Sequence, residues 1–183
     1  MPRHESPNPA PAAAANNLAG RDIADVLRAQ GWLRPDPSPA EVAWCERAAA
    51  LLGPQVSDRR ALLELLRVVF HYDAHEILAK VETHAVLSRY AARDVLRQLG
   101  LLLLDGAPLT TDRFKEVVNI LRDSLGIRSR ELFHPIRLAL AGRVGEGELD
   151  RVILLLEEAA ALSFATRVKS ARERILEFCA ALD

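Results

Sequence analysis

Apolar residues recur every three or four positions along most of the chain, which is the spacing that places them on one face of an α-helix. Nowhere do β-branched residues alternate with polar ones over the length of a strand. The pattern therefore predicts an all-α fold, an irregular multi-helix bundle whose helices differ too much in length for a repetitive solenoid. The clearest apolar stripe consists of Phe114, Val117, Val118, Leu121 and Leu125.

Capping residues set several of the expected helix starts. Ser38 followed by Pro39 and Glu41 has the pattern of a capping box with proline at the first helical position. Asp73, with Glu76 three residues later, predicts a second N-cap because its carboxylate can accept hydrogen bonds from the first free backbone N–H groups. Both starts are therefore predicted from local side chains alone.

Other helix ends depend on single residues. Ser57 and Thr111 are expected to open the helices that they precede, and Gly126 and Gly142 to end theirs. Pro135 is expected in the first turn of a short helix, where its missing N–H costs no hydrogen bond. The expected helices cover residues 22–30, 39–52, 57–70, 77–80, 82–103, 111–125, 135–141, 148–161 and 165–182.

The distribution of large apolar residues predicts how the chain divides. Residues 1–18 are rich in Pro, Ala and Asn, and with so few large apolar side chains they are expected to form a flexible tail. Residues 19–183 are expected to form one helical domain, since a chain of 183 residues that is 50% apolar is long enough to bury a core. A loop at Asp105–Pro108 allows a division of that domain into two lobes, 19–104 and 109–183.

The charge of the chain is nearly balanced overall but uneven along its length. A formal net charge of −1 argues against a general nucleic-acid binder, because lysine and arginine supply most non-specific affinity for phosphate. Between Arg113 and Arg143, however, seven basic and three acidic residues give a local charge of +4. A surface that contacts nucleic acid is therefore expected to be local.

The segment Ser129–Asp150, SRELFHPIRLALAGRVGEGELD, carries a recognisable pattern. It resembles a signature near the C-terminus of bacterial glutamyl-tRNA synthetases, and residues 110–126 occupy the place of the helix that precedes this signature. The family has a Gly-Pro loop and a Leu-Leu-Gly-Lys motif, where this chain has residues 145–147 and 155–158 without a glycine in the second motif. This departure predicts a longer helix there. The residues that match the signature are Leu132, Phe133, Pro135, Arg137, Ala139, Leu140 and Gly142.

The resemblance implies a fold and a function. It implies a helical cage like the anticodon-binding domain, present as a free-standing, noncatalytic module that binds the anticodon arm of tRNA. Arg128, Arg130 and Arg143 are the leading candidates for tRNA contact, since they lie in the connections beside the signature helix and can reach phosphates. Arg137 is a fourth candidate with two interpretations, contact with RNA or stabilisation of the fold by pairing with a carboxylate such as Glu131.

Motifs for catalysis are absent from the sequence. It contains neither the HIGH nor the KMSKS motif of a class I synthetase, and the glycine-rich stretch 142–147 leads into acidic residues that disfavour a phosphate. His71 and His75 superficially resemble a metal site, but Asp73 between them indicates a helix cap with partly buried histidines. We therefore expect no catalytic residues, no cofactor and no metal.

The remaining features predict a cytoplasmic protein without a membrane segment. The two cysteines, Cys45 and Cys179, lie at the spacing of apolar helix positions and are expected to be buried free thiols. The longest apolar run, Leu101–Leu104, is far shorter than a membrane span, and the start of the chain does not have the pattern of a signal peptide.

Two alternatives to a tRNA-binding module stay open from the sequence. In one, the domain has lost RNA binding and acts as a helical adaptor or regulator that docks on a synthetase or another protein. In the other, the chain is the separately encoded half of a split aminoacyl-tRNA ligase.

Overall fold

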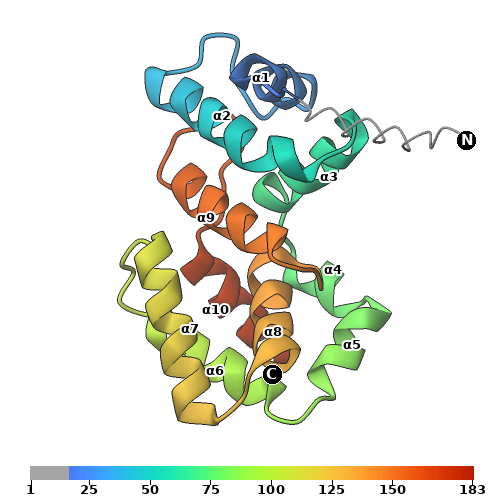
Figure 1. Ribbon diagram of the computed structural model, residues 1–183, viewed down its shortest axis with the longest axis vertical. Helices are drawn as coiled ribbons and strands as arrows, with labels where there is room; N and C mark the ends of the chain where they lie inside the picture. Colours follow the sequence, from blue (N-terminus) through green and yellow to red (C-terminus); the bar gives the residue numbers. More distant parts are fainter. Residues whose placement is uncertain (1–16) are drawn as a thin grey trace, which may run out of the picture.

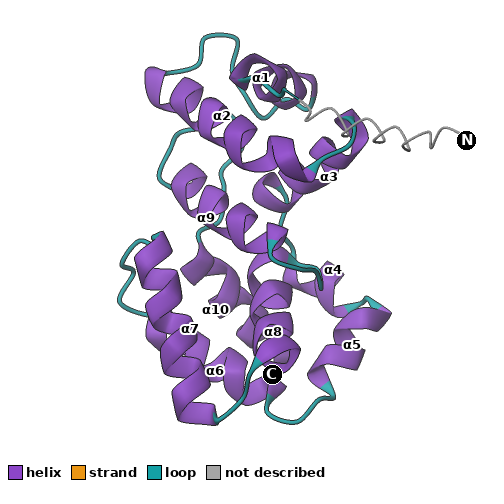
Figure 2. Ribbon diagram, viewed as in Figure 1, coloured by secondary structure: helices purple, strands orange, loops and turns teal. Residues whose placement is uncertain are grey.

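The computed structural model describes residues 17–183, so most of the predicted tail lies outside the described residues. All regular structure in this range is helical (Figure 2), which confirms the predicted all-α class. Leu18 is half-buried and packs against the core. The helices are α1 (Gly20–Ala29), α2 (Pro39–Leu52), the 3-10 turn η1 (Gly53–Gln55), α3 (Arg59–Phe70), α4 (Ala74–Leu78), α5 (Val81–Leu87), α6 (Ala92–Leu103), α7 (Thr111–Leu125), α8 (Ser129–Ala141), α9 (Glu148–Ala160) and α10 (Ala171–Leu182).

Helix α9 joins the two ends of the molecule. In Figure 1, α1, α2 and α3 form one end, whereas α4 to α8 and α10 form the other. Helix α9 packs against α2 and α3 as well as against α8, and α10 packs against α6, α4 and α8. The N-terminal helices therefore contact the rest of the protein through α9, a helix near the end of the sequence.

Aromatic side chains fill the contact between α9 and the N-terminal helices. Trp44 is fully buried and meets Phe164 edge to face, with ring centroids 5.2 Å apart. Phe70 also meets both rings edge to face, and Trp32 stacks on its outer side. The Trp44 indole N–H donates a hydrogen bond of 2.9 Å to the carbonyl of Leu155 in α9. Packing and a buried hydrogen bond thus fix α2 to α9.

The predicted caps are largely confirmed. Ser38 and Glu41 form the expected capping box at the start of α2. The Asp73 carboxylate accepts hydrogen bonds from the backbone N–H groups of the first turn of α4. Gly126 and Gly142 end α7 and α8 in the left-handed conformation, with φ of 67° and 72°.

The single helix predicted over 82–103 is wrong. The chain forms two helices instead, α5 and α6, and the break lies at Ala91, whose φ is 64°. Leu87, Ala91, Val95 and Leu99 all face the core, so the apolar spacing is preserved across the break. The break lets α5 turn and pack against α4 and α8, which a straight continuation of α6 would not reach.

The predicted place of Pro135 at the start of a helix is also wrong. Helix α8 begins at Ser129, so Pro135 lies inside it. The earlier start buries Leu132, which is 1% exposed, and thereby extends the apolar face of the helix. Proline at this position removes one helical N–H, and the carbonyl that loses its donor belongs to Glu131, an exposed residue.

Several predicted starts differ from the structure. Asp58 rather than Ser57 caps α3, and Thr110 rather than Thr111 caps α7. The last helix begins at Ala171 instead of residue 165, because Ser170 forms a capping box that the sequence analysis missed. Helices α1 and α4 begin two and three residues earlier than predicted.

The buried residues form one core cluster across the proposed boundary at 104–109, and the division into two lobes stays a prediction.

Candidate nucleic-acid interface

Helix α8 positions all four arginines that the sequence singled out. Arg128 is its N-cap residue, Arg130 lies in its first turn, Arg137 lies in its second half, and Arg143 follows the glycine that ends it. From Leu132 onwards nearly every residue of α8 is buried, so the helix reaches the surface only at its ends. The ends of one core helix therefore carry the exposed arginines.

Arg137 is held inside the protein. Its Nε and Nη2 donate to the two carboxylate oxygens of Asp150 at 2.9 and 3.0 Å, and its Nη1 donates to the carbonyl of Gly145 at 2.9 Å. The guanidinium also lies over the Phe133 ring, 4.8 Å from its centroid. The residue is only 7% exposed. These contacts join α8 to the following loop and to α9, and they favour the fold-stabilising interpretation, with Asp150 rather than Glu131 as the partner.

Arg128 and Arg130 are exposed at the start of α8. The Arg130 guanidinium lies 3.8 Å from the Glu146 carboxylate, but the two side chains are 77% and 71% exposed. An ion pair as exposed as this one contributes little to stability, and another anion can easily replace Glu146 as the partner of Arg130. Arg128 is exposed beside it, at the N-cap position. Both guanidinium groups are accessible to a ligand.

Arg143 lies at the opposite end of α8. Its Nη2 donates to the backbone carbonyl of Glu64 at 3.1 Å, and its side chain is 36% exposed. Lys80 donates to the Gly142 carbonyl beside it at 3.2 Å. At a rise of 1.5 Å per residue, the two ends of α8 are about 20 Å apart. The structure therefore does not bring Arg143 together with Arg128 and Arg130.

Arg89 joins the group at the start of α8, and the sequence analysis missed it. Its Nη1 lies 2.7 Å from Nδ1 of His134, a residue of α8 that is 8% exposed. Burial, followed by the positive charges of Arg89 and Arg130, lowers the pKa of His134 below its ordinary value. The imidazole is therefore neutral near pH 7 and accepts the hydrogen bond from Arg89. We call Arg89, Arg128 and Arg130 the α8-start cluster.

A buried arginine holds the other end of α8. Arg174 is fully buried, and its guanidinium donates to four backbone carbonyls at distances between 2.6 and 3.0 Å. These carbonyls lie in α3, in α8 and just before α10. Burial lowers the pKa of Arg174 to about 10, so the group stays charged near neutral pH. The acceptors are the carbonyls of Val68, Val69, Leu140 and Lys169.

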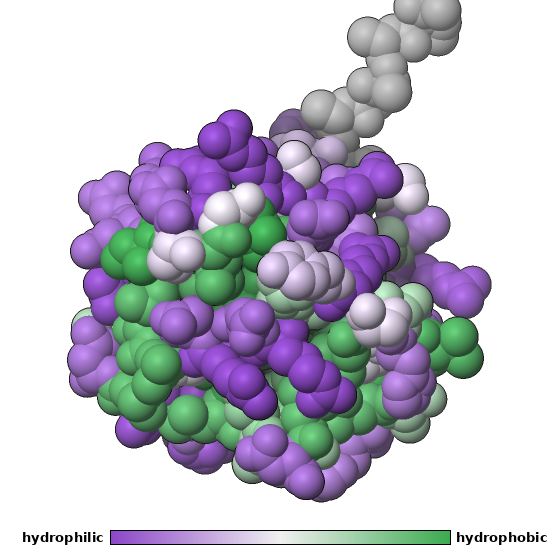
Figure 3. Space-filling model, turned by 90° about the horizontal axis from the view of Figure 1, so that it is seen from below, coloured by the Kyte–Doolittle hydropathy of each residue, from purple (hydrophilic) through white to green (hydrophobic). Residues whose placement is uncertain are grey.

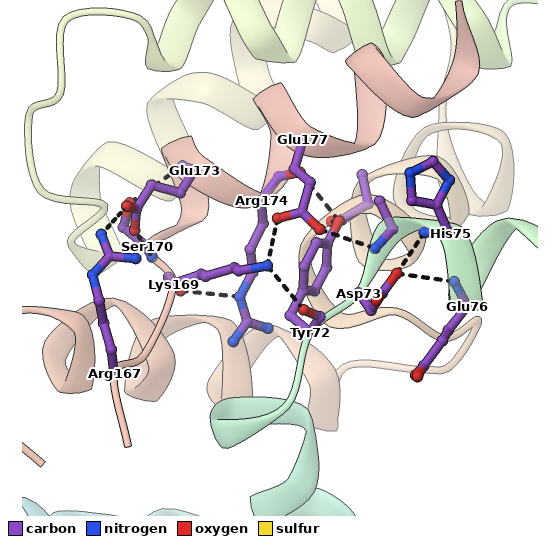
Figure 4. Close-up of polar contacts among 12 residues, drawn as sticks. Tyr72, Asp73, His75, Glu76, Arg167, Lys169, Ser170, Glu173, Arg174 and Glu177 are labelled. Atoms are coloured by element: carbon purple, nitrogen blue, oxygen red, sulfur yellow. Dashed lines mark hydrogen bonds and ion pairs between the residues drawn. The ribbon is translucent and has the colours of Figure 1, made fainter. Parts of the chain in front are cut away.

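Tyr72 and two charged residues complete this buried network (Figure 4). The Tyr72 hydroxyl donates to the Ala139 carbonyl of α8, and the Arg174 guanidinium lies 4.8 Å from the centre of its ring. Lys169 donates to the Tyr72 carbonyl at 3.1 Å and pairs with Glu177 at 2.6 Å. Burial raises the pKa of the Tyr72 hydroxyl well above its usual range. The network fixes α8 relative to α3, α4 and α10.

The two histidines that resemble a metal site are separated by the Asp73 cap, as the sequence indicated. They are exposed, however, not partly buried as expected, and His71 pairs with Glu76 at 2.7 Å. Within residues 17–183, no three acidic, histidine or cysteine side chains are grouped to hold a metal ion. Cys45 is a buried free thiol, whereas Cys179 is a free thiol that is only half-buried.

Among residues 17–183, none of the helices combines the length with the apolar character needed to cross a membrane.

Fold and site together define a class of protein, an all-helical domain in which one buried helix presents arginines at its ends. A family model described as "Anticodon binding domain" matches residues 21–163. Because this match covers well over half of the chain, the protein belongs to the anticodon binding domain family.

Curated relatives support the same family. The glutamate–tRNA ligase of Desulforudis audaxviator (strain MP104C) is 30% identical over 150 residues, covering 76% of this chain and 28% of that protein. Glutamate–tRNA ligase 2 of Syntrophus aciditrophicus (strain SB) is 27% identical over 123 residues, covering 67% and 25%. The glutamate–tRNA ligase of Bacillus subtilis (strain 168) is 26% identical over 136 residues, covering 74% and 28%. No solved structure gave a significant match.

These matches confirm the resemblance to the anticodon-binding domain of bacterial glutamyl-tRNA synthetases that the signature indicated. They favour the interpretation as a tRNA-binding module over a helical adaptor. The chain spans about a quarter of the length of the curated relatives that it matches.

Proposed function

We propose that this protein is a cytoplasmic tRNA-binding module that holds the anticodon arm and performs no catalysis itself. The family match over residues 21–163 is the observation that carries this proposal. The relatives are named glutamate–tRNA ligases, and the family model that matches this chain is described as an anticodon binding domain.

The proposed contacts are ion pairs between exposed arginines and tRNA phosphates. Arg128 and Arg130 present open guanidinium groups at the start of α8, and Arg143 is partly exposed at its far end. A planar guanidinium can donate two hydrogen bonds to one phosphate, which suits backbone contact. The spacing of about 20 Å between the ends of α8 fits contacts with separated phosphates better than a single binding pocket. Arg137 would act indirectly, by holding the loop that carries Glu146.

The nearly neutral net charge predicts selectivity for shape over general affinity for phosphate. At a formal charge of −1, a few local arginines have to supply the attraction, so binding is expected to weaken as salt is added, with a slope set by the small number of arginine–phosphate ion pairs. Contacts with unstacked loop bases would then distinguish the anticodon arm from a plain duplex.

A filter-binding titration of the full chain tests the proposed function. At moderate salt, tRNA is expected to bind more tightly than an RNA duplex of equal charge. Equal affinities for the two RNAs would refute the proposal, because phosphate attraction alone would then account for binding.

A pair of double variants tests the proposed contacts. Arg128→Gln with Arg130→Gln is expected to weaken binding across tRNA species and to reduce the slope of log affinity against log salt by about 1 for each arginine–phosphate ion pair removed. The matched control is Arg21→Gln with Arg28→Gln, two exposed arginines of α1 at the opposite end of the molecule in Figure 1. Similar losses of affinity in both double variants would show that general charge, not the start of α8, governs binding.

A further inference from the structure

Tyr90 is an exposed aromatic residue beside the α8-start cluster. Its side chain is 89% exposed, more than any other large apolar or aromatic residue in the part of the chain that the structure describes. The other phenylalanine, tryptophan and tyrosine rings in that part are buried or half-buried, including Phe133 of the signature. A ring exposed to this degree contributes little to the core, and its flat face is free to contact a ligand.

The turn between α5 and α6 fixes where Tyr90 lies. On one side, the left-handed backbone of Ala91 breaks the helix. On the other side, the backbone of Arg89 accepts a hydrogen bond from the N–H of Ala92 and donates one to the carbonyl of Val86. The Arg89 side chain is in turn bonded to His134 of α8. Tyr90 therefore projects from a closed turn that is tied to the core.

Arg89 of the α8-start cluster lies in this turn, and Arg130 lies near its partner His134. Arg89 lies next to Tyr90 in the chain, and Arg89 and Arg130 both act electrostatically on His134. The end of the molecule that includes the start of α8 is seen from below in Figure 3, where hydrophilic side chains run between the apolar areas. A protein partner usually requires a contiguous apolar patch, whereas one exposed ring with an arginine next to it in the chain suits a nucleotide, which offers a flat base and a phosphate.

We propose that Tyr90 stacks against an unpaired base of the bound RNA while Arg89 and Arg130 contact the phosphates beside that base. This inference rests on the proposed tRNA-binding function and deepens it, because it assigns base contact to the α5–α6 turn. Single-stranded loops present bases that are free to leave the stack, and aromatic side chains accept such bases with little regard to sequence. Tyr90 and the α8-start cluster together would then bind an unpaired loop, and not only the charged backbone of a stem.

The test uses the full chain and two RNA probes, a hairpin with an unpaired loop and the same strand annealed to its complement. Tyr90→Ala is expected to weaken hairpin binding about 5- to 150-fold, which is the ~1–3 kcal/mol of one stacked base at 1.4 kcal/mol per tenfold. Binding of the duplex is expected to change little. Tyr90→Phe keeps the ring and should retain hairpin affinity. Val81→Ala, a change at another residue that is 83% exposed, is the matched control.

Removal of single bases from the loop identifies the stacked position. One abasic site is expected to weaken binding to the wild-type chain but to cause no further loss of affinity in Tyr90→Ala, because both changes remove the same contact. Additive losses at every loop position would overturn the inference.

The outcomes separate this inference from the proposed function. A wild-type chain that prefers the hairpin, with Tyr90→Ala binding equally well, overturns the stacking contact alone. A wild-type chain that binds hairpin and duplex equally overturns both. Far-UV circular dichroism and thermal unfolding of Tyr90→Ala should match the wild type, since so exposed a side chain adds little to stability.

Discussion

On α8, two arginines of the same signature segment have opposite environments. Arg130 is 77% exposed and forms one long ion pair, whereas the Arg137 side chain is 9% exposed and bonds to both oxygens of Asp150. Arginine suits both places, because its guanidinium stays charged and offers a planar set of donors. At the scale of single residues, burial therefore separates the arginines that can meet RNA from those that hold the fold.

Replacement of Arg137 tests this separation. Arg137→Ala leaves Asp150 without its partner, and that side chain is only 24% exposed. We expect the free energy of unfolding to fall by about 2–4 kcal/mol, as when one member of a largely buried ion pair is removed. Urea unfolding measures the change. Arg130→Ala is the control and should stay within about 0.5 kcal/mol of the wild type; equal losses in the two variants would contradict the assigned roles.

His134 predicts a pH dependence of stability. Its folded-state pKa lies below the ordinary value of 6.5, because of burial and the nearby arginines. The unfolded chain therefore takes up the proton first as the pH falls. The stability that the neutral imidazole contributes is fully present above pH 6.5, and it is lost as the pH falls towards the folded-state pKa.

Urea unfolding at pH 7.5 and at pH 5.5 checks this sign. The wild type is expected to lose stability between the two values, and His134→Gln, which keeps an acceptor for Arg89, is expected to lose less. Asp73 and Glu173 have lowered pKa values too, but they titrate at lower pH. An identical pH dependence in both proteins would rule out His134 as the source.

Residue roles could be predicted only in part from the sequence. The signature indicated Arg137 as important, but its two interpretations could not be separated without its partner Asp150, which lies in another helix. Arg89 and Tyr90 were missed because the expected helix over 82–103 made them ordinary surface positions. An Arg-Tyr pair at a helix break would have indicated a candidate binding position, but the break could not be predicted from the sequence.

At the scale of helices, several local signals were predictable, although the capping box at Ser170 was missed, whereas long-range ones were not. The capping box at Ser38 and the left-handed glycines at 126 and 142 were predictable, since their hydrogen bonds join residues that are close in sequence. The break at Ala91 was not, because the same apolar spacing continues across it. Its cause is the packing of α5 on α4 and α8, which no local pattern records.

The glycine that ends α8 provides a test at this scale. Gly142 has a φ of 72°, and an added Cβ would lie 3.1 Å from the side chain of Ile77. Gly142→Ala is expected to cost about 1–3 kcal/mol of unfolding free energy, from the left-handed backbone and this close contact. Gly147→Ala is the matched control, since its φ is −62° and its Cβ would meet no atom within 4 Å. Chemical denaturation should show no loss of stability in the control, and a loss as large as that of Gly142→Ala would contradict the prediction.

Across the whole molecule, Arg174 joins three helices through backbone carbonyls. Arg174→Met fills much of the same volume but removes the donor from three buried carbonyls and one partly buried carbonyl. We expect a loss of more than about 3 kcal/mol in unfolding free energy, because unsatisfied buried carbonyls are costly. Thermal and urea unfolding measure it. Arg172→Met, at an exposed position of the same helix, should cost less than about 1 kcal/mol; a comparable loss there would show that the buried contacts are not the cause.

The union of α2 with α9 has a consequence for synthesis on the ribosome. The Trp44 indole finds its acceptor, the Leu155 carbonyl, 111 residues later in the chain. At a translation rate of about 5–20 residues per second, that delay amounts to roughly 6–20 s. During this interval the nascent N-terminal helices expose a tryptophan-rich apolar surface, so they are expected to depend on chaperones until nearly the whole domain has emerged.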